Sequence, residues 1–432
     1  MNECDALTAT SAQGFREFRV AVLVLHGVGQ QDRFETLASF AAGLAEAAGV
    51  EEVTRTPLLI DDKLESALTV DLPGVKVDLI EYYYQPLMQR KVGLSDVTRW
   101  LVETGFHIRR LYREYDFKSA DPQGARAARP PPNGDFLKLH YMLYQQGNRI
   151  AVWFLWSLAW LIDLLEHWRD IPLTPLVRVP LRYFLGRFID PVLKEVAGDL
   201  ILYTAFDPKL SLSSVRDEVL KGCIERLETI IRCEKEGEPR YRQVFVVGHS
   251  LGSVVAYDAV SRIAMRTDYE RVTGLKSAPV LTTEEVARLG GLVTFGSPLD
   301  KIALMFWPRF EEPASNDASN FIEWQKRRTA YRQGLLAHFH GIRGLSEALR
   351  LPASVRQPPT GSFADLPWLN VHHPDDLIAG HLDAFAGVEN LQLDQKIEAT
   401  FAATRTAEAH GIYWSDPAIY NWLRSRFTVS GA

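Results

Sequence analysis

Cysteine is scarce in this sequence, and long runs of one charge are absent. Three cysteines occur among 432 residues, at Cys4, Cys223 and Cys233. They are too few and too widely spaced for a disulfide framework or a zinc site, so a reducing, intracellular environment is expected. The net charge is −6 and no long basic tract is present, which argues against nucleic acid as a partner.

The sequence also lacks the segments that direct proteins into or across membranes. Residues 1–14 form a polar tail without the basic and apolar regions of a signal peptide. The most apolar segment, 150–162, would rise only ~20 Å as a helix, whereas a bilayer core is ~30 Å thick. We therefore expect a cytoplasmic protein with at most peripheral contact with a membrane.

The sequence does contain an alternation of strand-like and helix-like segments. With 47% hydrophobic and 24% charged residues, its composition is that of a globular protein. Strands are expected at 18–25, 75–84, 244–247, 292–298, 368–373 and 388–393, and helices at 34–48, 219–231 (capped by Ser213 or Ser214) and 254–265. This alternation predicts an α/β fold with a mostly parallel central sheet and helices on both faces.

A long insertion interrupts the alternation. We expect a core formed by 15–94 and 206–432, and an inserted helical cap or lid at 95–205. The apolar segment 150–162 fits two interpretations: a helix buried between cap and core, or the underside of a lid. In the second, the aromatic and arginine-rich stretch 150–187 would contact lipid headgroups at a membrane surface.

One motif indicates the chemistry. The β-favouring residues 244–247 run into Gly248-His249-Ser250-Leu251-Gly252, and an amphipathic segment at 254–265 follows. Strand, sharp turn and helix form the context in which Gly-x-Ser-x-Gly makes a nucleophile elbow. The small residues Gly248 and Gly252 let strand and helix approach closely, and the helix start presents free N–H groups to developing negative charge. Ser250 is therefore the expected nucleophile.

A serine nucleophile needs a histidine as base and a carboxylate that orients this histidine. Downstream of such an elbow, the acid comes before the histidine in the chain. His410 lies beyond the last expected strand and can return over the sheet, so it is the expected base. Asp376 is the expected acid, because it lies in the loop that follows the strand at 368–373. Asp375 and Asp300 are the alternative acids.

The tetrahedral intermediate of such a reaction needs two N–H donors for its oxyanion. One is expected from Leu251, the residue after the nucleophile, and the other from the loop after the first strand, at Val28 or Gly27. This chemistry needs no cofactor. No matched ligand spacing predicts a metal site, the pair His338 and His340 included.

These residues carry a family resemblance. The matching segments are the His26-Gly27 loop, 248–252, 294–298, Asn370 with 374–379, and 410–414. In them the chain resembles the α/β-hydrolase superfamily, on its lipase and phospholipase side, over the core but not over the cap. Intracellular phospholipases and glycolipid deacylases of this superfamily have a similar Asn…Pro-x-Asp-Pro-Val-Ala stretch whose Asp is catalytic. That alignment selects Asp376 over Asp375, with Leu377 where those families often have proline.

The resemblance implies the α/β-hydrolase fold and hydrolysis of carboxylic esters through an acyl-enzyme, with a lipid or a small ester as substrate. The cap is where such families differ and where they select the substrate. A soluble carboxylesterase, a thioesterase or an acyltransferase would use the same residues. A catalytically dead, membrane-associated scaffold on the same fold is the alternative outside enzymes.

Overall fold

The computed structural model describes residues 18–27, 32–60, 63–88, 213–235, 237–273, 281–299, 363, 365–376, 378–382, 385, 387–398 and 408–427. The expected cap at 95–205, with its apolar segment 150–162 and its lipid-facing stretch 150–187, lies outside the described residues. The tail 1–14, Val28, Asp300, His338 and His340 also lie outside them.

The described chain is built on an eight-stranded sheet in the order β10-β9-β8-β7-β1-β4-β3-β2. The strands are β1 (Arg19–Leu25), β2 (Val53–Ile60), β3 (Lys63–Leu72), β4 (Val75–Tyr82), β7 (Gln243–His249), β8 (Leu289–Phe295), β9 (Trp368–His372) and β10 (Glu389–Gln392). From β10 to β4 all neighbours are parallel, whereas β3 and β2 are antiparallel additions at one edge. The short strands β5 (Glu234–Lys235) and β6 (Glu238–Pro239) form a separate hairpin. The predicted α/β class and mostly parallel sheet are thus confirmed.

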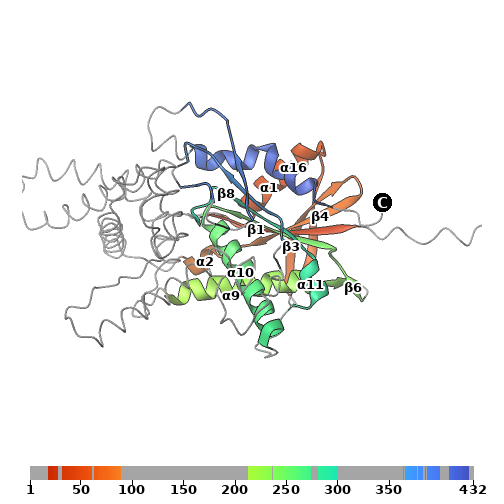
Figure 1. Cartoon of the computed structure of the whole chain (residues 1–432). Coiled ribbons are helices and arrows are strands. Elements are labelled where there is room, and N and C mark those ends of the chain that lie inside the picture. The colour runs from red at the N-terminus through yellow and green to blue at the C-terminus, as the bar shows by residue number, and fades with distance from the viewer. Residues whose placement is uncertain are drawn as a thin grey trace, which may run out of the picture.

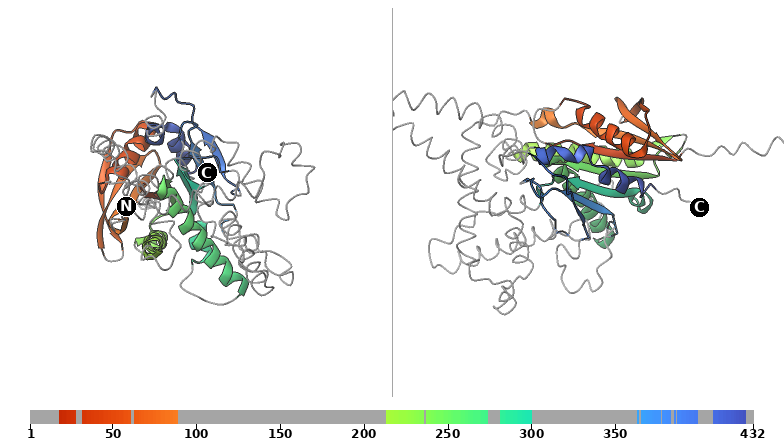
Figure 2. Two further views of the ribbon diagram at one scale, coloured as in Figure 1. Left: turned by 90° about the vertical axis from the view of Figure 1, so that its left-hand side faces the viewer. Right: turned by 90° about the horizontal axis from the view of Figure 1, so that it is seen from above.

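Helices cover both faces of the sheet, as predicted (Figure 1). On one face lie α1 (Glu35–Ala48) and α16 (Pro417–Arg424), and on the other lie α9 (Ser213–Arg232) and α10 (Leu251–Thr273). Figure 2 shows the same layers from two further directions. The shorter helices are α2 (Gln85–Met88), α11 (Thr283–Ala287) and the 3-10 turn η5 (Ile412–Ser415). In the part of the chain that the structure describes, no helix has the length and apolar character needed to cross a bilayer.

The central strand β1 shows why the chain folds this way. Val20, Val22 and Val24 point to the α1 and α16 side, and the residues between them point to the α9 and α10 side. All are fully buried, as expected for a parallel strand covered on both faces. The predicted apolar stripe of α9 is buried in the same way, at Val219, Leu220, Ile224, Leu227 and Ile231.

Two sequence predictions need correction, and one hairpin was missed. The hairpin of β2 and β3 was not predicted, because Pro57 and the exposed residues 53–55 give β2 no strand-like alternation. Proline is tolerated there because β2 is the edge strand. The start of α10 is not amphipathic: every residue from 251 to 261 is buried. Finally, Ser213 and Ser214 both lie inside α9, so neither is the residue before the helix that was expected to cap it.

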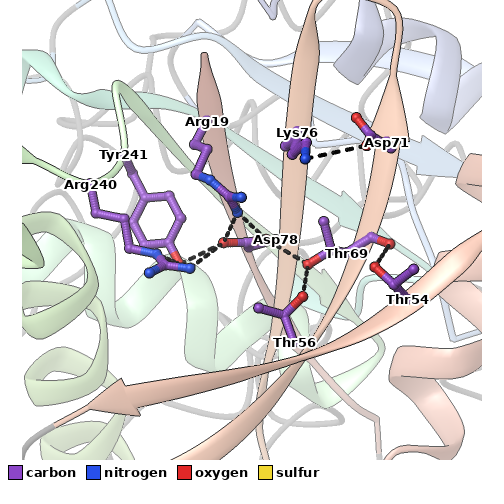
Figure 3. A network of polar contacts seen from close by, with 9 residues as sticks. All are labelled: Arg19, Thr54, Thr56, Thr69, Asp71, Lys76, Asp78, Arg240 and Tyr241. Atoms are coloured by element: carbon purple, nitrogen blue, oxygen red, sulfur yellow. Dashed lines mark hydrogen bonds and ion pairs between the residues drawn. The ribbon is translucent and has the colours of Figure 1, made fainter. Parts of the chain in front are cut away.

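A buried polar network ties together the amino-terminal ends of the central strands (Figure 3). Asp78 of β4 is completely buried, and its carboxylate accepts hydrogen bonds from Arg19 (3.1 Å), Arg240 (3.2 Å), Tyr241 (3.0 Å) and Thr69 (2.7 Å). Arg19 opens β1, and Tyr241 lies just before β7. The network therefore joins four neighbouring strands, β7, β1, β4 and β3, near the end of the sheet from which β1 and β7 begin.

Candidate active site

The candidate site lies at the opposite end of the sheet, where β1 and β7 end. β1 has β4 on one side and β7 on the other. The strands that follow β1 in the chain, β2 to β4, are added on one side of it, and β7 to β10 are added on the other side. Ligands of open α/β sheets bind at such a switch point, beyond the carboxyl ends of the strands. Gly27 follows β1 and Ser250 follows β7, which places both at this point.

Ser250 occupies a sharp turn between β7 and α10. Its φ angle is 52°, in the left-handed region that residues other than glycine rarely adopt. Its N–H donates to the Phe295 carbonyl oxygen (3.0 Å), and its carbonyl accepts the Ser253 N–H (3.0 Å). The strand, the strained residue and the helix together have the geometry of a nucleophile elbow.

Two buried serines support this turn. The Ser253 hydroxyl hydrogen-bonds to the Ser250 carbonyl oxygen and lies 2.7 Å from the Ser297 hydroxyl. The Ser297 oxygen also accepts the Leu299 N–H (3.4 Å). Sequence reasoning assigned no role to Ser253 or Ser297, because their importance depends on β7 and β8 being neighbours.

The elbow glycines are required by close backbone contacts. A Cβ on Gly248 would lie 2.5 Å from the Gly252 carbonyl oxygen, and a Cβ on Gly252 would overlap the His26 carbonyl oxygen. A Cβ on Gly27 would lie 2.9 Å from the Cβ of Ser250. Gly27 therefore lets the loop after β1 lie directly against Ser250.

The candidate oxyanion donors are only partly described. Leu251 is the first residue of α10, where N–H groups have no acceptor within the helix. Gly27 lies beside Ser250, and Val28 falls outside the described residues. The start of α10 next to the Gly27 backbone is suited to stabilise negative charge that develops on a substrate oxygen.

His410 and Asp376 form a close pair next to the elbow. The Nδ1 atom of His410 lies 2.8 Å from Oδ2 of Asp376. Asp376 follows β9, is 3% exposed, and its other carboxylate oxygen accepts the Ile378 N–H (2.9 Å). Burial alone would raise the pKa of Asp376, but the hydrogen bonds from His410, Tyr413 and Ile378 outweigh it and lower the pKa. The carboxylate is therefore ionised and holds the imidazole by Nδ1.

The second nitrogen of His410 is available as a base. His410 lies in the helical turn 408–411, and its Nε2 atom is buried without a hydrogen-bond partner. Because Nδ1–H donates to Asp376, Nε2 carries the lone pair. The Ser250 hydroxyl is not hydrogen-bonded to Nε2 in this structure, and such contacts are often longer in unliganded enzymes than in substrate complexes.

The alternative acids are placed differently. Asp375 is half-buried in the turn after β9, and its N–H donates to Nδ1 of His373 (3.1 Å). The carboxylate that pairs with His410 belongs to Asp376, not to Asp375. Asp300 lies outside the described residues.

The hydrogen bonds of Asn370 in β9 show why an asparagine precedes the loop that carries Asp376. Its side-chain N–H groups donate to the Gly380 carbonyl (3.0 Å) and to the Asn390 side chain (2.9 Å). Its side-chain oxygen accepts the Thr294 hydroxyl (3.1 Å). Asn370 therefore links β8, β10 and the far end of the loop that carries Asp376.

His249, the residue before Ser250, connects the turn at Ser250 to the turn that carries His410. Its Nε2 atom lies 3.0 Å from the His410 carbonyl oxygen, and the two imidazole rings are 4.7 Å apart. Burial, together with the nearby His410, lowers the pKa of His249 to about 3. His249 is therefore neutral and donates its Nε2–H to the turn that carries His410. Apart from its position within the motif, no sequence feature of His249 indicates this role.

His26 holds the loop after β1 in a similar way. Its Nδ1 donates to the Gly27 carbonyl (2.8 Å), and its Nε2 accepts the Tyr84 N–H (3.3 Å). The Tyr84 ring stacks on His26 at 4.1 Å, and its hydroxyl donates to the His26 carbonyl (2.7 Å). Burial lowers the pKa of His26 to about 4, so the ring is neutral, as this bonding requires.

The described residues include no group of three or more His, Cys, Asp or Glu side chains arranged to hold a metal ion. What the site does contain is a strained serine, a histidine with a free Nε2 lone pair and a buried, ionised aspartate, all at the carboxyl ends of parallel strands. Comparisons with models of known protein families, with curated proteins and with solved structures found no match for this chain.

Proposed function

We propose that the protein is a serine hydrolase that cleaves carboxylic esters through an acyl-enzyme on Ser250. The observation that carries this proposal is the 2.8 Å contact between His410 and Asp376, made beside the left-handed turn of Ser250. These residues come from different parts of the chain and meet at the switch point of the sheet. The residue types, their order and their meeting point are those of a Ser–His–Asp triad.

In the proposed mechanism, Nε2 of His410 removes the Ser250 proton as the Ser250 oxygen attacks the ester carbonyl. Asp376 keeps the imidazole in the required tautomer and stabilises the imidazolium that forms. His410 then protonates the leaving alcohol, which leaves an ester on Ser250. Water, activated by the same histidine, hydrolyses this ester and regenerates the serine.

The backbone around the elbow would stabilise the intermediate. The N–H of Leu251, at the start of α10, is the first proposed donor to the oxyanion. The loop after β1, at Gly27 and Val28, is proposed to provide the second. No cofactor or metal is required for these steps.

The proposed substrate class is a lipid ester. This proposal depends on the apolar segment 150–162 and on the lipase-like branch of the resemblance, together with an α/β-hydrolase fold that carries an inserted cap at 95–205. It implies a cytoplasmic enzyme that contacts membranes through 150–187. A soluble carboxylesterase, a thioesterase or an acyltransferase would use the same three side chains.

The test is the hydrolysis of p-nitrophenyl esters, from acetyl to palmitoyl, by the full chain and by Ser250→Ala. We expect kcat to fall by about 10⁴ to 10⁶ in Ser250→Ala, because the nucleophile is lost. Ser261→Ala is the matched control: Ser261 is a buried serine of α10, the helix that follows Ser250, and its hydroxyl has no hydrogen-bond partner. The control variant should retain the kcat of the unmodified chain.

The chain length of the best ester tests the substrate class: a long-chain optimum supports a lipid ester, and an acetyl optimum supports a soluble carboxylesterase. If the folded protein turns over no ester in solution, the assay is repeated on phospholipid vesicles. Absence of turnover there, with vesicle binding that survives Ser250→Ala, would overturn the enzymatic proposal and support a membrane-associated scaffold.

A further inference from the structure

Tyr413 contacts the candidate acid, Asp376, and the sequence around Tyr413 did not predict this contact. Its hydroxyl donates a hydrogen bond of 2.8 Å to Oδ2 of Asp376, the same oxygen that accepts Nδ1–H of His410. The Tyr413 side chain is completely buried. We propose that Tyr413 is a positioning residue that shares the Asp376 carboxylate with His410 and thereby sets the basicity of the catalytic histidine. This inference rests on the proposed function.

The Tyr413 hydroxyl is fixed on both of its sides. While it donates to Asp376, its oxygen accepts the backbone N–H of His373 (3.0 Å). The carboxylate in turn accepts the Ile378 N–H on its other oxygen. Tyr413 therefore binds the same carboxylate oxygen as His410 and, together with the Ile378 N–H on the other oxygen, restricts the rotation of the carboxylate. It also joins η5 to the loop after β9.

The chemistry of this arrangement has a definite direction. A hydrogen bond from a phenol stabilises the ionised carboxylate and withdraws part of its negative charge from a second donor. Burial and the neighbouring Asp376 charge raise the pKa of Tyr413, so the phenol keeps its proton and donates throughout the physiological range. With Tyr413 in place, Asp376 stabilises the imidazolium of His410 less than an unshared carboxylate would.

The other ionisable groups around His410 and Asp376 neither add a charge beside the pair nor donate a hydrogen bond to the carboxylate in place of Tyr413. His249 faces His410 from the end of β7 and is neutral, because burial and His410 lower its pKa to about 3. His373, on the loop after β9, is bonded to the Gln395 carbonyl (2.7 Å) and to the Asp375 N–H. His26, more distant at the end of β1, is also neutral. Among the described residues, Tyr413 is thus the hydroxyl donor that binds the Asp376 carboxylate together with His410.

The test is an NMR titration of the His410 imidazole in the full chain and in Tyr413→Phe, with the pH profile of kcat/KM measured in parallel. Loss of the phenol hydroxyl leaves the carboxylate charge undivided, so the midpoint of the His410 titration should rise by about 0.5 pH units. The acid limb of kcat/KM should move in the same direction, and kcat should fall about tenfold because the carboxylate loses one constraint.

Tyr420→Phe is the matched control. Tyr420 is also a buried tyrosine of the same hydrophobic cluster, and its hydroxyl donates to the Trp414 carbonyl (2.7 Å) rather than to the acid. The Tyr420→Phe substitution should lower the free energy of unfolding without moving the midpoint of the His410 titration. A midpoint that stays unchanged in Tyr413→Phe, or that moves equally in both variants, would overturn the inference.

A second substitution covers the case in which Tyr413→Phe does not fold. 3-Fluorotyrosine in place of Tyr413 is a stronger hydrogen-bond donor, so the His410 midpoint should fall; a midpoint that rises or stays would overturn the inference. The titration needs no turnover, so its outcome can be distinguished from the outcome of the test of the proposed function. A shifted midpoint in a protein without esterase activity would leave the Tyr413 arrangement standing and overturn the proposed function instead.

Discussion

At the scale of single residues, backbone strain is concentrated where the chemistry is proposed. Ser250 and Phe34 are the residues other than glycine with positive φ in the described chain, at 52° and 73°. Each such conformation costs about 1–3 kcal/mol and persists only where surrounding contacts enforce it. At Ser250 these contacts are the hydrogen bonds to Phe295 and Ser253. Phe34 donates its N–H to Glu81 (2.8 Å) at the start of α1, the helix that follows the loop beside Ser250.

The adjacent aspartates provide a stringent test of the acid. Asp376→Asn should lower kcat for ester hydrolysis by about 10⁴, because an amide can hold the imidazole in the wrong tautomer. Asp375→Asn, one residue away, should change kcat by less than about threefold, since Asp375 does not hold the His410 ring. Circular dichroism of both variants checks the fold. Equal losses of kcat in the two variants would remove Asp376 from the proposed triad.

The sequence predicts Ser250, Asp376 and His410 as candidate site residues, because the Gly-x-Ser-x-Gly motif and the order of acid and histidine in the chain limit the number of candidates. It did not reach Tyr413 or His249, whose roles are contacts between distant positions. Tyr413 and Asp376 are 37 residues apart, and His249 and the His410 carbonyl are 161 residues apart. Neither pair has a local pattern, so only the packing of η5 against the ends of β7 and β9 reveals them.

At the scale of elements, the central parallel strands were predicted from their burial on both faces, whereas the antiparallel edge hairpin of β2 and β3 was missed. β1 and β7 are buried at every position but the first, which is typical of central parallel strands. In β2 the residues 53–55 are exposed, and hydrogen bonds to β3 rather than burial define the strand. Pairing of this kind depends on the partner strand and leaves little trace in local composition.

The contact between β1 and α10 can be tested at Gly252. In Gly252→Ala the new methyl would meet the carbonyl oxygens of His26 and Leu25, which are backbone atoms that cannot rotate away. We expect the free energy of unfolding, measured with urea, to fall by about 3 kcal/mol, and ester hydrolysis to be lost with the elbow geometry.

Gly411→Ala is the control for this substitution. A Cβ on Gly411 would meet no atom within 4 Å, and the residue lies in the helical turn 408–411. Alanine is the better helix former, so stability should stay equal or rise by up to about 1 kcal/mol. A similar destabilisation at both glycines would show that the close approach at Gly252 is not what limits stability.

At the scale of the whole molecule, the buried polar network of Asp78 and the candidate site lie at opposite ends of one sheet. The Asp78 network holds the amino-terminal ends of β1 and β4 and the entry to β7 (Figure 3). The Ser250 turn and the pair of His410 and Asp376 lie beyond the carboxyl ends of the strands. A substitution at the first end should therefore change stability without changing the reaction.

Asp78→Asn tests this separation. It removes the carboxylate that faces Arg19 and Arg240 in a buried setting, so the free energy of unfolding should fall by about 3 kcal/mol. The kcat/KM of the folded fraction should change less than about threefold, because the network does not touch the site. Asp71→Asn, which breaks the exposed ion pair with Lys76 in the same region, should cost less than about 1 kcal/mol. A large loss of kcat/KM in Asp78→Asn would show that the two ends of the sheet are coupled.

The distance along the chain between the elbow and the base has a consequence during synthesis. The 161 residues between His249 and His410 take roughly 8–30 s to translate at about 5–20 residues per second. Throughout that interval a growing polypeptide contains the proposed nucleophile but no base. On the proposed function, nascent chains that do not yet contain His410 should be inert toward esters, because the turn 408–411 and η5 have not docked against the ends of β7 and β9.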